Sequence, residues 1–419
     1  MEEFLTSCHR AVKENLVQGP GFHVVLGNEA CDVDSMVSAL AYAYFLSQTV
    51  PRETLLVLPL LNIRQSDLLL RSDNLFLLRQ AGLSPDLLLF RDQLDLRALQ
   101  RAGRLRLTLV DHNVLPRSDS DLEEEVVEVI DHHLLERTPS PSCPVTVETV
   151  GSCATLVTER IIQKAPQILD QQLATLLYAT VVLDCVDMSP AAGKVTPRDV
   201  HVAAALETRF PSLPPRGALF KELQDAKFDI SGLDTEQMLL KDMKVVSGSL
   251  SLAVSVLYMT MEDFLQRAEL EAELSDFCQK FGFDLLLLMS ISFTESKEPI
   301  RALAVFGQSA TFRDQVGCFL EQARSPALAL RPISSLHPHI SAYQQGNTLA
   351  SRKKLLPLVK DFLKEWDGGG CRGEEEDDEE SQVPPTPMNS LADGCPLDGG
   401  LPHISPQDLE DKFNKMADL

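Results

Sequence analysis

Aspartate and histidine residues recur in this chain directly after apolar segments. Asp111 follows LTLV and precedes His112, and Asp131 follows VVEVI and precedes His132 and His133. A carboxylate at the end of a buried segment is costly unless it is paired, hydrogen-bonded or bound to a metal. Two Asp-His units in one region therefore favour a metal site. The structural alternative is that each aspartate caps a turn and each histidine is satisfied within the wall.

Three further aspartates extend this set. Asp32 and Asp34 lie in GNEACDVDS, between the apolar segment HVVLG and a helical pattern. This short Asp-x-Asp pattern is a weak signal alone, because Asp34 or Ser35 could simply cap the helix. Asp184 lies near the end of QQLATLLYATVVLDCVDM, which has the length of a buried helix. A carboxylate there opposes the helix macrodipole, so a nearby cation would stabilise it.

The donor types indicate which metal would bind. Several carboxylates with one or two imidazoles and no thiolate suit manganese or magnesium better than zinc. Cys31 and Cys185 flank the candidate ligands but lack the spacing of structural zinc ligands. We expect two ions, Mn²⁺ or Mg²⁺, bridged by an aspartate. They would activate water as hydroxide and hold the phosphoryl oxygens, which is the chemistry of phosphorus–oxygen bond hydrolysis.

A basic cluster lies far along the chain. Arg352, Lys353 and Lys354 stand just before Pro357, which we expect in the first turn of a helix ending near Trp366. Cations beside a helix N-terminus are unfavourable, whereas an anion bound there is stabilised by both the cations and the dipole. The alternative is a solvated basic turn. In so acidic a chain we favour phosphate binding.

Short apolar segments alternate with helical patterns between His23 and about Phe210. Segments without strict alternation indicate strands buried on both faces, and their alternation with helices indicates a parallel α/β sheet. Ligands bind at the carboxyl ends of such strands, where these aspartates fall. We predict strands over 23–27, 54–63, 86–90, 104–110 and 126–130, and helices over 34–48 and 153–165.

A second, smaller α/β or α+β domain follows the segment PSLPPRGA, whose prolines and glycine interrupt the pattern of the first domain. We predict strands over 250–259, 284–293 and 300–307 and a helix over 261–282 in this domain. Lys227, at its entrance, is a weaker phosphate-binding candidate, for which a surface position is the simpler interpretation.

Residues 367–419 carry 14 acidic and 3 basic side chains and little that could form a core, which predicts a disordered acidic tail. The predicted domains are 1–210, 211–366 and 367–419, with the active site in the interdomain cleft between the first two.

The composition limits the partners and the compartment. The formal net charge of -23 argues against a nucleic-acid or anionic-membrane surface, because both need clustered cations. The N-terminus lacks a signal-peptide layout, and no apolar segment is long enough to span a bilayer. The nine cysteines form no C-x-x-C pair. We therefore expect reduced thiols and a cytoplasmic protein, with a nuclear pool also allowed.

The order of the motifs resembles a known superfamily. DVDS, DHN, DHH and a later aspartate, followed by SRKK in a second domain, resemble the DHH phosphoesterases with a DHHA2-type domain, which include family II inorganic pyrophosphatases and exopolyphosphatases. VLGNEACDVDS, VGSCATLVTERI, AKFDISGL, QGNTLASRKKLLPL and the tail segment PPTPMNSLADGCPLD resemble the vertebrate prune proteins over almost the whole chain. The resemblance implies a metal-dependent phosphoanhydride hydrolase that releases phosphate from short-chain polyphosphates.

The resemblance also implies roles for individual residues. Asp111 matches a bridging metal ligand, and the other matched metal ligands are Asp32, Asp34, Asp184 and His132. The residues that match phosphate-binding positions are His133, Arg352 and Lys353, with Lys227 and Lys354 as weaker substrate candidates. The chain departs from the pyrophosphatases at Asn28, where they carry a histidine. We therefore expect one metal to be held less tightly, or with an extra water, and keep Asn28 as a weaker substrate candidate.

Several alternatives stay open. Pyrophosphate or a cyclic nucleotide is an alternative substrate, and a homo-oligomer is compatible with the sequence. The resemblance also implies that the tail binds nucleoside diphosphate kinase. The alternative from another class is a regulatory scaffold with a weakened metal site, to which Asn28 and the acidic tail both point.

Overall fold

The computed structural model describes residues 1–15, 19–49, 55–138, 140, 143–294 and 298–366. Within them the chain forms two compact units, one from Met1 to Asp229 and one that begins at Ile230. The predicted acidic tail lies outside the described residues. In the described part of the chain, no helix combines the length and the apolar character that a membrane span requires.

The first unit is built on a parallel sheet, as predicted. Five strands in the order β2-β1-β3-β4-β5 pair in parallel throughout. They are β1 (Gly21–Leu26), β2 (Leu55–Leu60), β3 (Leu105–Val110), β4 (Val126–Asp131) and β5 (Val145–Val147). The predicted strand over 86–90 is wrong. Pro85, which has no N–H for a ladder, begins a single 3-10 turn there, and only Phe90 bridges to Leu61.

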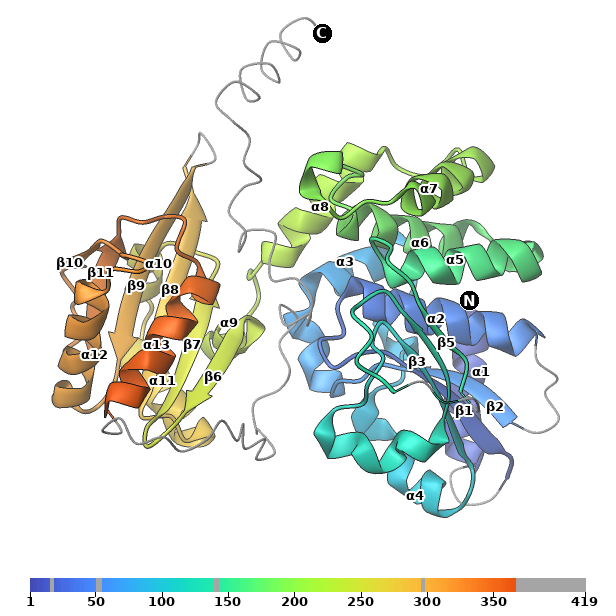
Figure 1. Ribbon diagram of the computed structural model, residues 1–419, viewed down its shortest axis with the longest axis horizontal. Coiled ribbons are helices and arrows are strands. Elements are labelled where there is room, and N and C mark those ends of the chain that lie inside the picture. Colours follow the sequence, from blue (N-terminus) through green and yellow to red (C-terminus); the bar gives the residue numbers. More distant parts are fainter. Residues whose placement is uncertain (16–18, 50–54, 139, 141–142, 295–297, 367–419) are drawn as a thin grey trace, which may run out of the picture. The chain divides into compact units, whose positions relative to one another are not determined.

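Helices cover both faces of this sheet (Figure 1). On one face Val25, Val110 and Ile130 pack against α2, α5 and α6, and on the other Val24 and Leu107 pack against α1 and α4. Burial on both faces explains the unbroken apolar segments. The helices are α1 (Glu2–Asn15), α2 (Val33–Thr49), α3 (Ser72–Gln80), α4 (Leu96–Arg101), α5 (Cys153–Lys164), α6 (Gln171–Asp184), α7 (Pro197–Arg209) and α8 (Arg216–Phe228). Six 3-10 segments complete the unit: Gln65–Leu70, Pro85–Leu87, Arg91–Gln93, Arg117–Glu125, Pro166–Ile168 and Pro190–Ala192.

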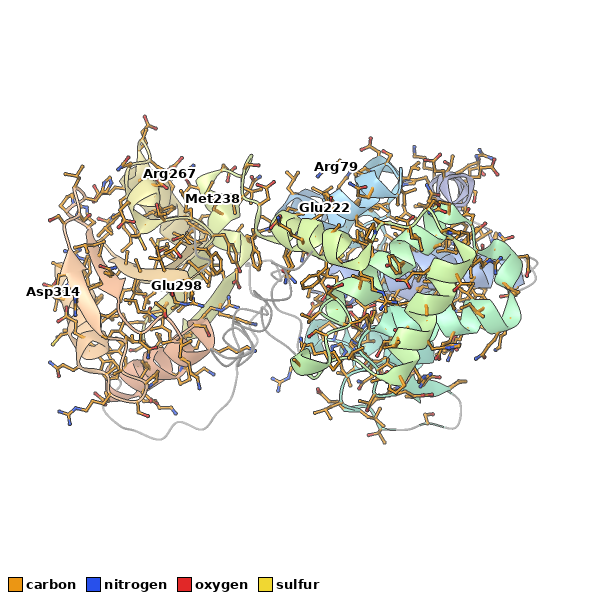
Figure 2. All side chains as sticks on the ribbon, turned by 90° about the horizontal axis from the view of Figure 1, so that it is seen from above. Arg79, Glu222, Met238, Arg267, Glu298 and Asp314 are labelled. Atoms are coloured by element: carbon orange, nitrogen blue, oxygen red, sulfur yellow. The ribbon has the colours of Figure 1, made fainter. Side chains whose placement is uncertain are left out.

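Helix α8 belongs to the first unit by its packing. It contacts α3 and α6, although the predicted boundary at 210/211 lies before it. Arg79 on α3 and Glu222 on α8 are exposed on the outer side of these two packed helices (Figure 2). This packing matters for the site described below, because Lys227 lies in the last turn of α8.

The second unit is built on a six-stranded mixed sheet in the order β10-β11-β9-β8-β7-β6. Strands β7 and β8 pair in parallel, whereas the other neighbours are antiparallel. The strands are β6 (Met243–Ser247), β7 (Ser251–Leu257), β8 (Leu285–Phe293), β9 (Pro299–Phe306), β10 (Leu330–Ile333) and β11 (Ile340–Gln345). The helices are α9 (Thr235–Lys241), α10 (Met261–Leu265), α11 (Leu270–Phe281), α12 (Ala310–Gln322) and α13 (Arg352–Trp366).

Two predicted helices of this unit are corrected. The single helix over 261–282 is two helices, because Glu269 has a left-handed backbone with φ of 59°, which an α-helix cannot continue through. Helix α13 begins at Arg352 and contains Pro357 in its interior, so the basic cluster forms its first turn rather than preceding it. Its apolar face, including Leu355 and Val359, packs into the core. This packing outweighs the hydrogen bond lost at the proline.

Candidate metal centre

The loop after β1 brings two aspartates to the N-terminus of α2. Asp32 Oδ1 accepts the backbone N–H of Ser35 at 3.1 Å, so Asp32 is the residue that caps the helix. Asp34 is buried, and it accepts the backbone N–H groups of Cys153 at 2.6 Å and Ala154 at 2.8 Å. These two donors open α5. The Asp34 carboxylate is therefore stabilised by a helix that lies far away in the sequence.

Two buried side chains hold the loop that carries Asp32. Arg71 donates from Nε to the carbonyl of Ala30 at 2.7 Å, and Asn74 donates from Nδ2 to the carbonyl of Cys31 at 2.9 Å. Cys31 has φ of 49°, a left-handed conformation that costs free energy in a residue with a Cβ. Sequence reasoning missed both supports, because arginine and asparagine are seldom fully buried.

Asp111 lies just beyond β3 and is 2% exposed, with a left-handed backbone at φ of 62°. Asn28 donates from Nδ2 to Asp111 Oδ2 at 2.9 Å and to its carbonyl at 3.1 Å. The other oxygen, Oδ1, is buried and accepts no regular hydrogen bond from the described residues. Burial, followed by the charge of Asp34, raises the pKa of Asp111 well above its usual value. A cation would satisfy this oxygen and relieve that penalty.

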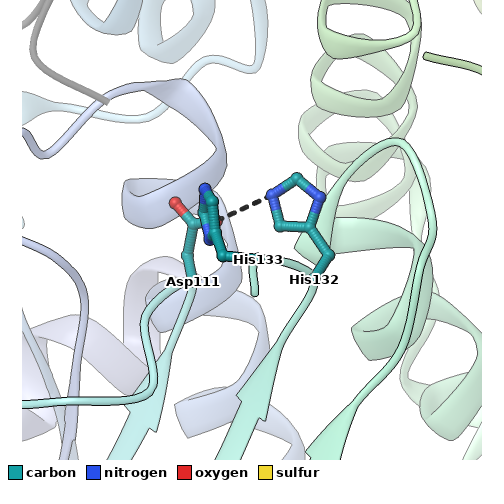
Figure 3. Close-up of side chains that lie close together, drawn as sticks. All are labelled: Asp111, His132 and His133. Carbon is teal, nitrogen blue, oxygen red and sulfur yellow. Dashed lines mark ion pairs between the residues drawn. The ribbon is translucent and has the colours of Figure 1, made fainter. Parts of the chain in front are cut away.

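His132 and His133, which follow β4, meet Asp111 (Figure 3). Nε2 of His132 lies 3.2 Å from Asp111 Oδ1 and 3.7 Å from Asp34 Oδ2. Its Nδ1 donates to the carbonyl of Val150 at 3.0 Å, which leaves Nε2 as the nitrogen that faces the carboxylates. Ligand atoms of Asp111, His132 and His133 all lie within 4.8 Å of one another.

The protonation of His132 reports the charge around it. Burial lowers the pKa of His132, but its contact with Asp111 and the charges of Asp111 and Asp34 outweigh burial and raise it to about 11. A proton held this tightly is a sign of excess negative charge. The same carboxylates would stabilise a divalent cation, which would replace that proton.

Asp131 orients His133 through its carboxylate. His133 donates from Nδ1 to Asp131 Oδ1 at 2.7 Å, and Asn113 donates from Nδ2 to Asp131 Oδ2 at 2.6 Å. Burial raises the pKa of Asp131, but the hydrogen bonds from His133 and Asn113 outweigh it and lower the pKa to about 2. With Nδ1 engaged, Nε2 is the nitrogen of His133 left for a ligand.

The sequence analysis missed Asn113, although its place two residues after Asp111 was a usable signal. His112 is a buried wall residue whose Nδ1 donates to a carbonyl.

Asp184 is the last residue of α6, which ends four residues before the predicted helix over 171–188 does. Its Oδ2 is buried and makes no regular hydrogen bond within the described part of the chain. Burial, then the charges of Asp34 and Asp32, raises the pKa of Asp184 well above its usual value. Residues 186–188 follow with three consecutive left-handed conformations, at φ of 48°, 55° and 58°. Strain next to the carboxylate cluster is typical of a functional site.

Lys227 lies close to this cluster. It is half-buried at the end of α8, and its positive charge lowers the pKa of Asp32, which burial and Asp34 together raise. The sequence alone favoured a surface position for this lysine. The packing of α8 on the first unit brings it to the carboxylates instead.

The donor set fits divalent cations that prefer oxygen. Asp32, Asp34, Asp111, Asp184 and His132 influence one another electrostatically, and Asp111 Oδ1 and Asp184 Oδ2 are buried without a regular hydrogen bond from the described residues. The neighbouring thiols are poor ligands, because burial raises the pKa of Cys31 to about 12 and a thiolate is the form that binds metal. Mn²⁺ or Mg²⁺ therefore suits the cluster better than Zn²⁺.

The basic cluster forms a separate group in the second unit. Arg352 is 4% exposed and makes an ion pair with Asp242, which is also buried. Lys353 and Lys354 are exposed in the same turn of α13. The three cations therefore differ in environment, although they are adjacent in sequence.

Comparison with known proteins identifies the family. The DHH family, N-terminal domain, matches residues 23–181, and the DHHA2 domain matches residues 221–362. A Bos taurus protein named Exopolyphosphatase PRUNE1 is 48% identical, over 100% of this chain and 97% of its own length. The Homo sapiens protein of the same name is 46% identical with the same coverage. The chain belongs to the prune family of DHH proteins.

A more distant relative matches part of this prune-family chain. A protein of Methanocaldococcus jannaschii named Manganese-dependent inorganic pyrophosphatase is 29% identical over 171 residues, which cover 39% of this chain and 48% of that protein. At Asn28, where the resemblance to pyrophosphatases implies a histidine, the amide has two structural partners. Its Oδ1 accepts the N–H of Cys31 at 3.0 Å, and its Nδ2 donates to Asp111. Asn28 therefore orients Asp111.

Proposed function

We propose that this prune-family chain is a metal-dependent phosphoanhydride hydrolase that releases phosphate from short-chain polyphosphates. The observation that carries the proposal is the convergence of four carboxylates with His132, where Asp111 Oδ1 and Asp184 Oδ2 are buried and accept no regular hydrogen bond from the described residues. Relatives named exopolyphosphatase, similar over nearly their whole length, support the choice of polyphosphate.

Two divalent ions, Mn²⁺ or Mg²⁺, are the proposed cofactors. The residues that would hold them are Asp32, Asp34, Asp111, Asp184 and His132. When bound, such ions supply Lewis acidity, which neutralises charge on phosphoryl oxygens and lowers the pKa of water. The name of the manganese-dependent relative supports a divalent metal.

Side chains of the protein would bind and stabilise the phosphoryl group. Asp131 holds Nδ1 of His133, so Nε2 is the atom that would contact a phosphoryl oxygen. Arg352 and Lys353 would bind phosphate through charge-assisted hydrogen bonds, and an arginine presents the donors in a fork that matches phosphate. Positive charge placed where negative charge develops lowers the barrier to transfer. Lys227 and Lys354 are weaker substrate-binding candidates.

Phosphate release from tripolyphosphate tests this function. Wild type should release phosphate with Mn²⁺ or Mg²⁺, and Asp111→Asn should reduce the rate by more than roughly a hundredfold, because loss of a ligand should exceed the effect of losing a residue that only supports one. Asp121→Asn is the matched control, since Asp121 is an exposed acid that pairs with Arg97 in the same unit. Absence of metal-dependent release by wild type would reject the hydrolase.

A second candidate, favoured by the geometry at Asn28, is an interaction protein with a weakened metal site. There an amide takes the place of an imidazole and orients Asp111. Asp184→Asn should leave partner binding intact under this candidate and abolish hydrolysis under the first. Deleting 367–419 should do the reverse, with nucleoside diphosphate kinase as the partner tested. Pyrophosphate and a cyclic nucleotide, run in the same hydrolysis assay, would rank the alternative substrates.

A further inference from the structure

The first turn of α13 contains an arginine that is both buried and held by a carboxylate. Arg352 is 4% exposed and Asp242 is 3% exposed, and Nη1 of Arg352 forms an ion pair with Asp242 Oδ1. Tyr258 donates from its hydroxyl to the other oxygen, Asp242 Oδ2, at 2.7 Å. Each oxygen of Asp242 thus meets a different group, which fixes the plane of the carboxylate.

The backbone also fixes Asp242. It immediately precedes β6, and its carbonyl accepts the N–H of Val256 at 2.9 Å, which continues the ladder between β6 and β7. Tyr258 lies two residues beyond Val256 on the neighbouring chain segment. Asp242 therefore stands on a rigid sheet edge, and a group on such an element positions its partner better than a group on a loop.

Lys244 is a second cation that interacts with Arg352 and Asp242. Lys244 lies two residues after Asp242, on the same face of the strand as Val246, which packs into the core that α13 covers. Burial, then the positive charge of Arg352, lowers the pKa of Lys244 to about 8, whereas Asp242 raises it. The two cations are therefore close enough to repel each other. An anionic ligand would relieve that repulsion.

The guanidinium keeps donors for such a ligand. An arginine has five N–H donors in a fixed fork, and the pair with Asp242 engages Nη1. The described residues offer Arg352 no acceptor other than Asp242. Its orientation is thus set by the Nη1 pair, and Nε and Nη2 carry N–H donors that this pair does not use.

We propose that Asp242, held by Tyr258, is the positioning residue that fixes the guanidinium of Arg352 for binding of a phosphate chain. The proposal rests on the hydrolase function proposed above and assigns a role to residues of the second unit that are not among the metal-ligand candidates. Asp242 does not touch the substrate, because a carboxylate would repel phosphate. It acts through Arg352.

A double-mutant cycle on the full chain tests the proposal. KM and kcat for tripolyphosphate would be measured for wild type, Asp242→Asn, Arg352→Lys and the double variant. Binding of imidodiphosphate, a pyrophosphate analogue with a bridging nitrogen, would be measured by calorimetry in Mg²⁺. Asp242→Asn should raise KM and weaken this binding by roughly tenfold, with a smaller change in kcat, as is typical when a supporting partner is lost. The double variant should bind no more weakly than Arg352→Lys, because the two residues act as one unit.

Two further variants separate positioning from folding. Tyr258→Phe removes one hydroxyl and leaves the ion pair, so it should change KM in the same direction by a smaller factor, even where Asp242→Asn fails to fold. Asp284→Asn is the matched control, because Asp284 is an exposed acid of the same unit that accepts the N–H of Ser251. Its KM should equal that of wild type.

The outcomes are distinct. Wild-type KM and affinity in a folded Asp242→Asn, or effects of Asp242→Asn and Arg352→Lys that simply add, would overturn the positioning role. If wild type binds imidodiphosphate but releases no phosphate, the hydrolase is rejected and the binding cycle alone decides on Asp242. If wild type neither binds imidodiphosphate nor releases phosphate, both proposals fail. If it releases phosphate without binding the analogue, the KM cycle alone decides on Asp242.

Discussion

The two units bury charge in opposite ways. In the first, Asp34, Asp111 and Asp184 converge, and burial and mutual repulsion raise the pKa of Asp111 and of Asp184 well above the usual range. In the second, Arg352 meets a single carboxylate, Asp242, in a pair that is already close to neutral. A cluster of like charges needs an external counter-ion, whereas a pair does not. The first unit should therefore depend on metal, and the second should depend on it far less.

Metal-linked stability should show the largest difference. An ion present at 100 times its Kd stabilises the folded state by about 2.7 kcal/mol. Wild type should therefore melt at a higher temperature in Mn²⁺ than in EDTA, and Asp111→Asn should lose most of this shift because it removes a ligand. Asp242→Asn, in the second unit, should keep the shift. Loss of the shift in both variants would contradict the division between the units, and calorimetry would measure it.

Asn28 should set how tightly the first unit holds its metal. Asn28→Ala removes the donor that orients Asp111 Oδ2. The Mn²⁺ concentration for half-maximal phosphate release should rise by about tenfold, as expected for loss of a group that supports a ligand. Gln172→Ala is the control, because that amide donates to the carbonyl of Ala81 away from the cluster. An unchanged metal requirement would mean that Asp111 keeps its orientation without the amide.

Lys227 is the one candidate cation that the described structure brings to the carboxylates. Lys227→Ala should raise KM for tripolyphosphate by about fivefold, corresponding to about 1 kcal/mol for a partly exposed charge. Lys221→Ala removes an exposed lysine from the same helix and should leave KM unchanged. Equal KM values for the two variants would return Lys227 to the surface role that its sequence context suggested.

Lys244 should give the smallest effect, on stability. Burial and Arg352 lower its pKa from 10.5 to about 8, so between these values the unfolded chain binds more protons than the folded chain. The free energy of unfolding should rise with pH across this window. Below pH 8 the buried positive charge of Lys244 should destabilise the folded state to its full extent. Lys244→Met removes the penalty, which solvent screening limits to about 1 kcal/mol. Denaturant unfolding at pH 7 and pH 10 would show a difference between wild type and variant that shrinks at pH 10. A constant difference would rule out titration of Lys244.

Only tertiary packing revealed several of the contacts that support the site. Asp34 accepts N–H groups from Cys153 and Ala154, and His132 is oriented by the carbonyl of Val150. No local pattern encodes contacts between such distant segments, because they depend on how the helices pack on the sheet. The same holds for Lys227, whose proximity to Asp32 follows from the packing of α8 on α3 and α6.

The sequence by itself determined the parallel sheet and the location of the key acids. Parallel strands place their carboxyl ends along one edge, so Asp111 and Asp131, each at or just past the end of a strand, had to be near each other. The length of the apolar pattern likewise put Asp184 near the end of a helix. The tertiary structure alone decided where α13 begins and that Arg352 meets Asp242. The physical reason is that local propensity and periodicity act over a few residues, whereas burial and ion pairing depend on segments that only the folded chain brings together.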